Sequence, residues 1–179
     1  MIILASQSPR RRELIKNITT EFTVIPSNVD ESIIHVPACD LPGELSKLKA
    51  YDIFNRYPND IVLACDTVVI LEGEVLGKPH TPEKAKEMLR KLSGKKHVVI
   101  SGYTYVSKEK EITRTVRTYV YFNKLSEELI DKYVATGSPL DKAGAYGIQD
   151  KEFDLVNHIE GDFNNVIGLP VDDIKKHCF

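Results

Sequence analysis

The sequence of 179 residues contains few cysteines, and their spacing excludes the common structural uses of this residue. The three cysteines, Cys39, Cys65 and Cys178, are odd in number, form no Cys-x-x-Cys pair and have no zinc-ligand spacing with the five histidines. We therefore expect neither a disulfide framework nor a zinc site, and a reducing cytoplasm is the compartment that fits.

The sequence also lacks long hydrophobic runs and an excess of charge of either sign. No apolar run approaches the length of a membrane span, and the N-terminus reaches Arg10 too early for a signal peptide. The formal net charge of −2 gives no global field for gripping a nucleic acid or an anionic membrane. Phosphate binding would then come from local clusters, which favours a small ligand over a polymer.

Neither a linker nor an internal repeat divides the chain, so we expect one domain over residues 1–179, with two lobes. Helical patterns are present at 9–17, 40–57, 81–92 and 126–136 and after Pro170. Strand patterns are present at 22–26, 61–71, 97–106, 113–122 and 153–159. Because the two kinds interleave without strict βαβ repetition, they predict an α/β fold with a mixed sheet.

Two segments carry more specific expectations. In the helix at 40–57, an apolar stripe is predicted to face the core: Leu45, Leu48, Tyr51 and Phe54. The glycine-rich segment 141–150 has neither helical nor strand period, so it is predicted to be a shaped loop.

An anion site is predicted where the first strand turns into the first helix. Ser8 is a suitable N-cap, and Pro9 suits the first helical position. Three arginines follow in the first turn, where the helix dipole is already positive, so a phosphate would relieve the conflict. The hydroxyls of Ser6 and Ser8 and the guanidinium of Arg10 would bind it. The alternative is a solvated basic helix face on which Glu13 pairs with Arg10.

Asp66 is the sharpest single signal because, with Thr67, it interrupts the most apolar segment of the chain, residues 61–71. A carboxylate in a buried strand is costly unless a cation or several donors hold it. The candidate partners are a divalent metal, Lys49, Lys78 or an arginine of the first helix. Alternatively, Asp66 caps a strand end or hydrogen-bonds Thr67 at a bulge.

Glu31 and Lys78 are weaker signals. Glu31 lies in an acidic turn that is either a solvated loop or, if it folds toward Asp66, the second carboxylate of a Mg²⁺ site. The run Gly77–Pro79 is not a P-loop, because the glycine spacing is one residue too short and proline replaces the hydroxyl residue. Lys78 is then either a point charge for a phosphate or an ordinary surface lysine.

Six segments, in this order and spacing, resemble the Maf family: Leu4–Arg11, Cys65–Val69, Gly77–Pro79, Met88–Gly94, Asp141–Gln149 and Gly168–Pro170. The resemblance covers essentially the whole chain. It implies an α/β fold with a long twisted mixed sheet flanked by helices, two lobes with a cleft between them and a homodimer. It also implies a cytoplasmic nucleoside triphosphate pyrophosphatase that uses Mg²⁺ or Mn²⁺. Some members of the family are linked to arrest of septum formation.

The resemblance also implies roles for individual residues. Four residues would be catalytic, and the two acids among them would bind the metal: Asp66, Glu31, Lys49 and Lys78. Three would set substrate specificity, in a combination similar to the branch acting on dTTP and UTP: Arg10, Thr67 and Gln149. The amide of Gln149 offers a donor and an acceptor, which can read a pyrimidine edge.

The sequence departs from the family pattern at two places. Asp150 stands where the family usually has glycine, which adds a negative charge beside the expected base pocket. The sequence ends at Phe179, without the longer terminal helix of many relatives, which weakens the expected dimer contact. Two other functions stay open: a nucleotide-binding regulator of septum formation without significant turnover, and a pyrophosphatase of purine or modified nucleotides.

Overall fold

The strands form a mixed sheet, as predicted. The computed structural model describes residues 1–179, and its strands are β1 (Ile2–Leu4), β2 (Phe22–Val24), β3 (Ile61–Leu71), β4 (Glu74–Leu76), β5 (Lys96–Val106), β6 (Glu111–Phe122) and β7 (Val156–Glu160). The sheet order is β2-β1-β3-β5-β6-β7, and β4 pairs with β3. β1 is parallel to β2 and β3, whereas the β3–β4 and β6–β7 pairs are antiparallel.

The helices begin and end close to the predicted boundaries. They are α1 (Pro9–Leu14), α2 (Leu41–Phe54), α3 (Pro82–Leu92), α4 (Glu127–Ala135), α5 (Phe163–Ile167) and α6 (Val171–Cys178). The five-residue α5 and the 3₁₀ turn at Glu31–Ile33 were not predicted, because elements this short show no measurable period. None of the helices is both long and apolar enough to cross a membrane.

The chain divides into two compact units. Unit 1 contains residues 1–67, 100–116 and 164–179, and unit 2 contains residues 68–99 and 117–163. The three long strands β3, β5 and β6 each contribute residues to both units.

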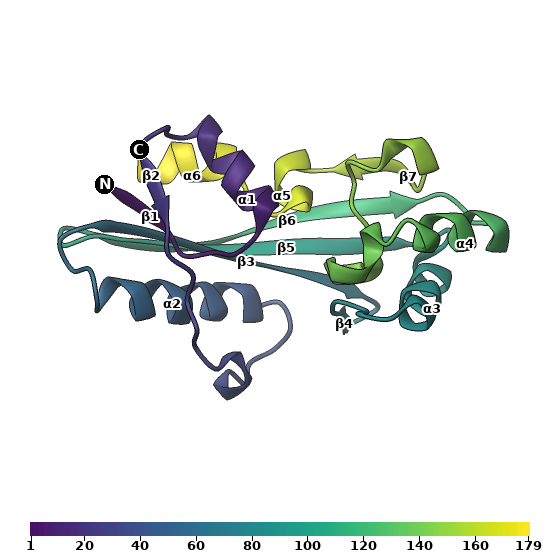
Figure 1. The fold of residues 1–179 in the computed structure, drawn as a ribbon, viewed down its shortest axis with the longest axis horizontal. Coiled ribbons are helices and arrows are strands. Elements are labelled where there is room, and N and C mark those ends of the chain that lie inside the picture. Colours follow the sequence, from purple (N-terminus) through teal and green to yellow (C-terminus); the bar gives the residue numbers. More distant parts are fainter. The chain divides into compact units, whose positions relative to one another are not determined.

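Unit 1 buries both faces of its part of the sheet. One apolar cluster includes Leu4, Leu14, Leu63, Tyr103 and Ile174. The other includes Ile3, Ala50, Ile53, Val62 and Val106. Neighbouring strand residues point to opposite faces, so the alternation of Ile3 with Leu4 and of Val62 with Leu63 separates the clusters. Helices α1 and α6 lie over one face, and α2 lies over the other (Figure 1).

Helix α2 packs partly through the predicted stripe. Leu45 is buried, and the half-buried Tyr51 and Phe54 pack against the core, as expected. The most buried face, however, also includes Ser46, Ala50 and Ile53, which the stripe did not contain. The cause is a close approach at Gly102 on β5, where a Cβ would overlap backbone atoms of Pro42 and Gly43. The first turn of α2 rests directly on the sheet, so small residues are required there.

Unit 2 is built around β4, the paired helices α3 and α4, and the glycine-rich segment (Figure 1). The rings of His97, Phe122 and Tyr146 pack edge-to-face in its interior, and His97 Nε2 lies 2.7 Å from the Tyr146 hydroxyl. The segment 141–150 contains only short 3₁₀ turns, which agrees with the predicted loop. Gly144 has φ +73°, and a Cβ there would crowd Val69.

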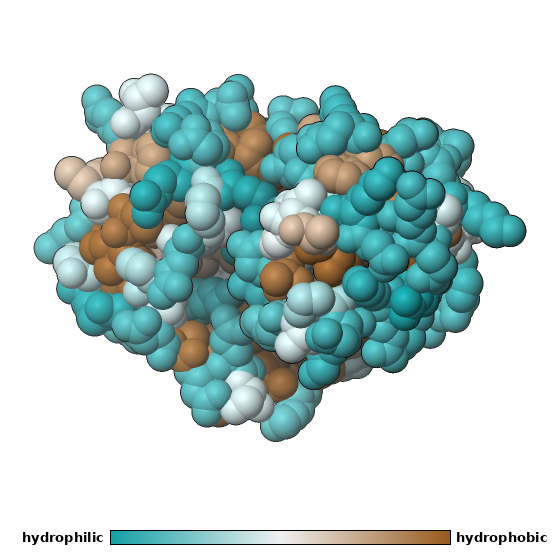
Figure 2. Space-filling model, turned by 45° about the vertical axis from the view of Figure 1, so that its right-hand side comes forward, coloured by the Kyte–Doolittle hydropathy of each residue, from teal (hydrophilic) through white to brown (hydrophobic).

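The surface drawn in Figure 2 is mostly hydrophilic, and its hydrophobic residues gather in small separate patches. Large apolar side chains that remain exposed include Ile33, Tyr57, Val75, Phe163 and Phe179. Scattered exposure of this kind is normal for a folded protein.

Candidate functional site

Lys49 joins the two acids that the sequence singles out. Asp66 lies in the interior of β3, Lys49 lies on α2, and Glu31 opens the 3₁₀ turn Glu31–Ile33. Lys49 Nζ donates to Asp66 Oδ1 at 2.9 Å and lies 2.9 Å from Glu31 Oε1. Among the candidate partners of Asp66, the structure therefore confirms Lys49, and it brings the acidic turn to the same cation.

The three side chains of this cluster differ in how far they are exposed to solvent. The side chains of Asp66 and Lys49 are 14% and 16% exposed, whereas that of Glu31 is 51% exposed. Burial by itself lowers the pKa of Lys49, but the charge of Asp66 and the hydrogen bonds to both acids outweigh it, so the pKa is raised. Lys49 therefore carries its positive charge at neutral pH.

The side chains of this cluster differ in how well they suit different divalent metals. No group of three or more His, Cys, Asp or Glu side chains is placed to hold a metal ion, so the closed cage of a structural zinc site is absent. The two carboxylates converge on the ammonium of Lys49, so the cation that they share in this structure is that lysine. Proteins hold Mg²⁺ through one or two carboxylates, together with several waters and oxygens of substrate phosphates. By ligand type, Asp66 and Glu31 therefore suit Mg²⁺ or Mn²⁺.

The serine-proline turn forms as predicted. The Ser8 hydroxyl oxygen accepts a hydrogen bond from the Arg11 N–H at 3.3 Å, which makes Ser8 the N-cap of α1. The buried Ser6 hydroxyl oxygen accepts from the Ser8 N–H at 3.1 Å. Both hydroxyls therefore hold the turn as acceptors and still have a hydrogen to donate. The half-buried Arg10 follows in the same turn, and its predicted binding of a phosphate stays a prediction.

Arg11, which the sequence did not single out, is tied to the neighbour of Asp66. Its Nη2 donates to Thr67 Oγ1 at 3.0 Å and its Nε donates to the Gly168 carbonyl oxygen at 2.7 Å. Arg11 lies three residues before the buried Leu14 and so shares its face of the helix, a signal that could have separated it from its two neighbours. Glu13 forms an ion pair with Lys16 at 2.8 Å, and the alternative pairing of Glu13 with Arg10 stays a prediction.

Lys78 lies in unit 2, exposed and between two fixed backbone points. The carbonyl oxygen of Gly77 accepts a hydrogen bond from the Gly144 N–H at 3.2 Å, and the His80 N–H donates to the Leu140 carbonyl oxygen at 3.0 Å. The structure thus brings the Lys78 segment together with the glycine-rich segment.

Gln149, also in unit 2, is exposed on a turn whose next residue is the unexpected Asp150. The Asp150 carboxylate is hydrogen-bonded within unit 2. The hydroxyls of Tyr133 and Ser138 each donate to its Oδ2 at 2.7 Å. The acid is therefore part of a polar network, which no local sequence pattern predicts.

Comparison with known proteins agrees with the six sequence segments. The model of the family described as Maf-like protein matches residues 1–178. This chain belongs to the Maf family. One Maf relative, the dTTP/UTP pyrophosphatase of Thermosipho africanus, is 49% identical over 173 residues, which cover 97% of this chain and 89% of that protein. The dTTP/UTP pyrophosphatase of Pyrococcus furiosus is 46% identical over 176 residues, which cover 98% and 92%. Among solved structures, the Staphylococcus aureus Ham1 protein has a TM-score of 0.49 and 17% identity, and the match covers 68% of this chain and 70% of that chain.

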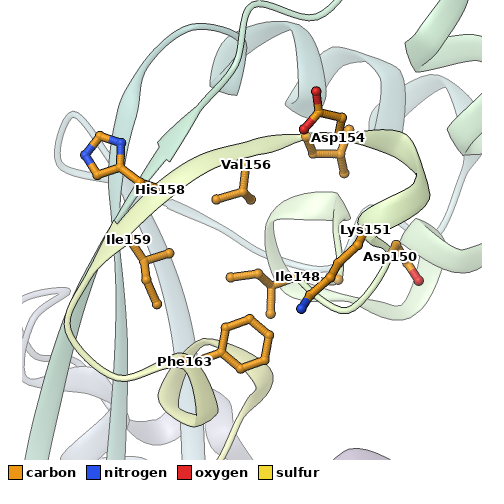
Figure 3. A pocket seen from close by; sticks show the side chains of 10 residues that line it. Ile148, Asp150, Lys151, Asp154, Val156, His158, Ile159 and Phe163 are labelled. Carbon is orange, nitrogen blue, oxygen red and sulfur yellow. The ribbon is translucent and has the colours of Figure 1, made fainter.

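Unit 2 of this Maf protein also contains a cavity of about 330 Å³ whose lining includes Gly147, Ile148 and Asp150, the neighbours of Gln149. Its wall is mainly apolar, and in Figure 3 the side chains of Ile148, Val156, Ile159 and Phe163 surround it. The Lys151 side chain extends toward Phe163, with its Nζ 5.3 Å from the centre of the Phe163 ring (Figure 3). A mainly apolar hollow with a few polar groups has the character of a small-molecule site.

Proposed function

We propose that this protein is a nucleoside triphosphate pyrophosphatase that hydrolyses dTTP and UTP to the monophosphate and pyrophosphate. The observation that carries the proposal is the convergence of Asp66 and Glu31 on Lys49 Nζ, at 2.9 Å each. The substrate follows the names of the Maf relatives, which match over nearly their full length at 49% and 46% identity.

In this proposal Asp66 is the general base. A water oxygen forms a bond to the α-phosphorus, the bond from that phosphorus to the bridging oxygen breaks, and pyrophosphate leaves. The proton of the water passes to Asp66. Because Oδ1 already accepts from Lys49, Oδ2 is the atom available for that proton. At 14% exposure the carboxylate is sheltered, yet still open to a water molecule.

Charge on the triphosphate would be balanced in two ways. Mg²⁺ or Mn²⁺, held by Asp66 and Glu31, would supply Lewis-acid stabilisation to the phosphate oxygens when bound. The chain itself offers cations and hydroxyl donors for the phosphates: Lys49, Lys78, Arg10, Ser6 and Ser8. Lys49, charged at neutral pH, also keeps two like charges close together before the substrate arrives.

Recognition of the base is assigned to Arg10, Thr67 and Gln149. The amide of Gln149 can pair with a pyrimidine edge, and a base that leaves the amide unsatisfied would be rejected. The hydrogen bond from Arg11 to Thr67 adds Arg11 as the residue that fixes the Thr67 hydroxyl.

The same proposal covers the setting of the protein. It is a single Maf-like domain of residues 1–179 that works in the cytoplasm as a homodimer, on free nucleotides rather than a nucleic acid polymer or a membrane. The near-neutral net charge of −2 favours a small ligand over a polymer or a membrane, and the family match over residues 1–178 supports a single Maf-like domain. Its role is housecleaning of the nucleotide pool, with a link to division arrest.

A product analysis on a panel of nucleotides tests the proposed function. The purified chain is incubated with Mg²⁺ or Mn²⁺ and dTTP, UTP, CTP, purine triphosphates or methylated triphosphates, and products are separated by ion-exchange chromatography. We expect equal amounts of monophosphate and pyrophosphate, fastest from dTTP and UTP. Release of diphosphate and orthophosphate would contradict the proposed bond cleavage. Nucleotide binding without turnover would support the regulator of septum formation instead.

A further inference from the structure

The turn that carries Gln149 is closed by its own backbone. The Asp150 N–H donates to the Gly147 carbonyl oxygen at 3.0 Å, and the Lys151 N–H donates to the Gln149 carbonyl oxygen at 2.8 Å. Gln149 therefore sits third in a tight four-residue turn that begins at Gly147 and ends at Asp150.

One buried hydroxyl ties the two ends of this turn together. Tyr133, on α4, is fully buried. Its hydroxyl oxygen accepts a hydrogen bond from the Gly147 N–H at 2.9 Å, and its hydrogen is donated to Asp150 Oδ2 at 2.7 Å. Burial first, and the hydrogen bond to Asp150 next, raise the pKa of Tyr133, so the hydroxyl keeps the hydrogen that it donates.

A second chain of hydrogen bonds holds Asp150 from another side. The Ser138 hydroxyl donates to Asp150 Oδ2 at 2.7 Å, and Lys142 Nζ donates to the Ser138 carbonyl and hydroxyl oxygens at 2.6 and 3.0 Å. Asp150 is also one of the residues that line the cavity, and in Figure 3 it lies at the edge of that group of side chains. The hydrogen bonds from Tyr133 and Ser138 both end on its Oδ2, so they fix the orientation of the carboxylate.

We propose that Tyr133 and Asp150 are positioning residues that fix the backbone of the Gln149 turn and so orient the amide that reads the base. The inference rests on the proposed function, because the reading of a pyrimidine by Gln149 belongs to it. It also gives a reason for an acid where the family usually has glycine, since Asp150 supplies the acceptor for Tyr133 and Ser138. Neither residue takes part in the chemistry at the α-phosphorus.

The test compares four variants with the parent: Tyr133→Phe, Asp150→Ala, Asp150→Asn and Tyr103→Phe. The last is a matched control in unit 1, where the buried Tyr103 hydroxyl also donates to a carboxylate, Asp173 Oδ2, at 2.7 Å. The measurements are kcat and KM for UTP and CTP with Mg²⁺, the Kd of both nucleotides by calorimetry without metal, and the urea unfolding midpoint.

For Tyr133→Phe and Asp150→Ala we expect KM for UTP to rise roughly tenfold, with a similar loss in the preference for UTP over CTP. We expect kcat to stay within about twofold, because Asp66 and Lys49 are unchanged. Asp150→Asn keeps an oxygen that can accept both hydrogen bonds, so its KM for UTP and its preference for UTP over CTP should equal those of the parent. Tyr103→Phe should lower the unfolding midpoint without changing the preference, which separates orientation of Gln149 from a general loss of stability.

Two failures can be told apart. If the parent releases pyrophosphate but Tyr133→Phe keeps its KM and its UTP preference, the positioning role is overturned and the proposed function stands. If the parent releases no pyrophosphate, the proposed function fails, and the ratio of the Kd values for UTP and CTP then tests the positioning role on its own. A ratio that differs between Tyr133→Phe and the parent supports the positioning role. An unchanged ratio, or a parent that binds neither nucleotide, overturns the positioning role.

Discussion

The side chain of Arg11 reaches across unit 1 to Thr67, with 3.0 Å between Nη2 and Oγ1, and so connects the first helix to the residue that follows Asp66. The same guanidinium holds the carbonyl oxygen of Gly168, just before α6, at 2.7 Å. One arginine therefore connects α1 to β3 and to the segment just before α6. Thr67 in turn lies 2.8 Å from the hydroxyl of Ser101 on β5, which extends the connection to the next strand.

Replacing Arg11 should therefore cost stability. Arg11→Ala leaves the Thr67 hydroxyl and the Gly168 carbonyl without their charged donor, and we expect the free energy of unfolding to fall by about 2 kcal/mol. Arg12→Ala, at the exposed neighbouring position, is the control and should be indistinguishable from the parent. Urea unfolding of both variants measures the difference, and equal losses would contradict the role of Arg11.

Gly102 should tolerate no side chain. A Cβ there would overlap backbone atoms of Pro42 and Gly43, so Gly102→Ala must push α2 away from the sheet. We expect a loss of about 3 kcal/mol in unfolding free energy, since backbone cannot yield as a flexible side chain can. Because α2 carries Lys49, pyrophosphate release should fall as well.

Gly43→Ala provides the control from the opposite side of this contact. A Cβ at Gly43 would meet Thr115 Cγ2 at 3.4 Å and Thr113 Cγ2 at 3.9 Å, which are ordinary contacts, and alanine favours the helix. The variant should therefore stay within about 1 kcal/mol of the parent. If Gly102→Ala had the same unfolding free energy as Gly43→Ala, the predicted cost of moving α2 away from the sheet would be contradicted.

His97 should make unit 2 sensitive to acid. Burial lowers the pKa of His97 to about 4, below the 6.5 of an exposed histidine. The unfolded chain then binds more protons than the folded chain between these values, so stability falls as the pH drops from 6.5 to about 4 and is flat above 6.5. The full effect is roughly 3 kcal/mol. Urea unfolding against pH should show this slope, and His97→Leu should remove it.

Lys49 should show the opposite pH behaviour. Its pKa is raised in the fold, so the stabilisation is fully present below 10.5 and is lost only as the pH rises through the folded value. Lys49→Met leaves two acids without their cation, and we expect it to lose about 3 kcal/mol at neutral pH. The difference between parent and variant should stay constant from pH 7 to 9. A difference that shrinks within that range would contradict a raised pKa.

The sequence predicts most elements because their signals are local. The apolar segment 61–71 is β3 to the residue, and the Thr81-Pro82 and Ser126 starts mark α3 and α4. The full buried face of α2 could not be predicted, because it depends on Gly102 in a strand about sixty positions later. Hydrophobic periodicity records which residues are apolar, but not how closely a helix approaches its sheet.

The site was predictable to a similar extent. The cost of burying a carboxylate points to a cation for Asp66, and Lys49 was among the named candidates. Composition could not choose Lys49 over the others, because the choice is made by α2 lying over β3. The Arg11–Thr67 and Tyr133–Asp150 contacts were missed because each joins positions that are separated in sequence, and no local pattern says which distant side chain will be the partner.

The most direct test of the proposed chemistry is pyrophosphate release from UTP by the parent and by Asp66→Asn, at saturating Mg²⁺ and matched thermal stability. Asparagine keeps the size of the side chain and an oxygen for Lys49, but it cannot take a proton from water or lend its charge to a metal. We expect the parent to form pyrophosphate and UMP in equal amounts and the variant to be slower by about 10²–10⁴-fold. Release by Asp66→Asn within a few-fold of the parent would contradict the role of Asp66.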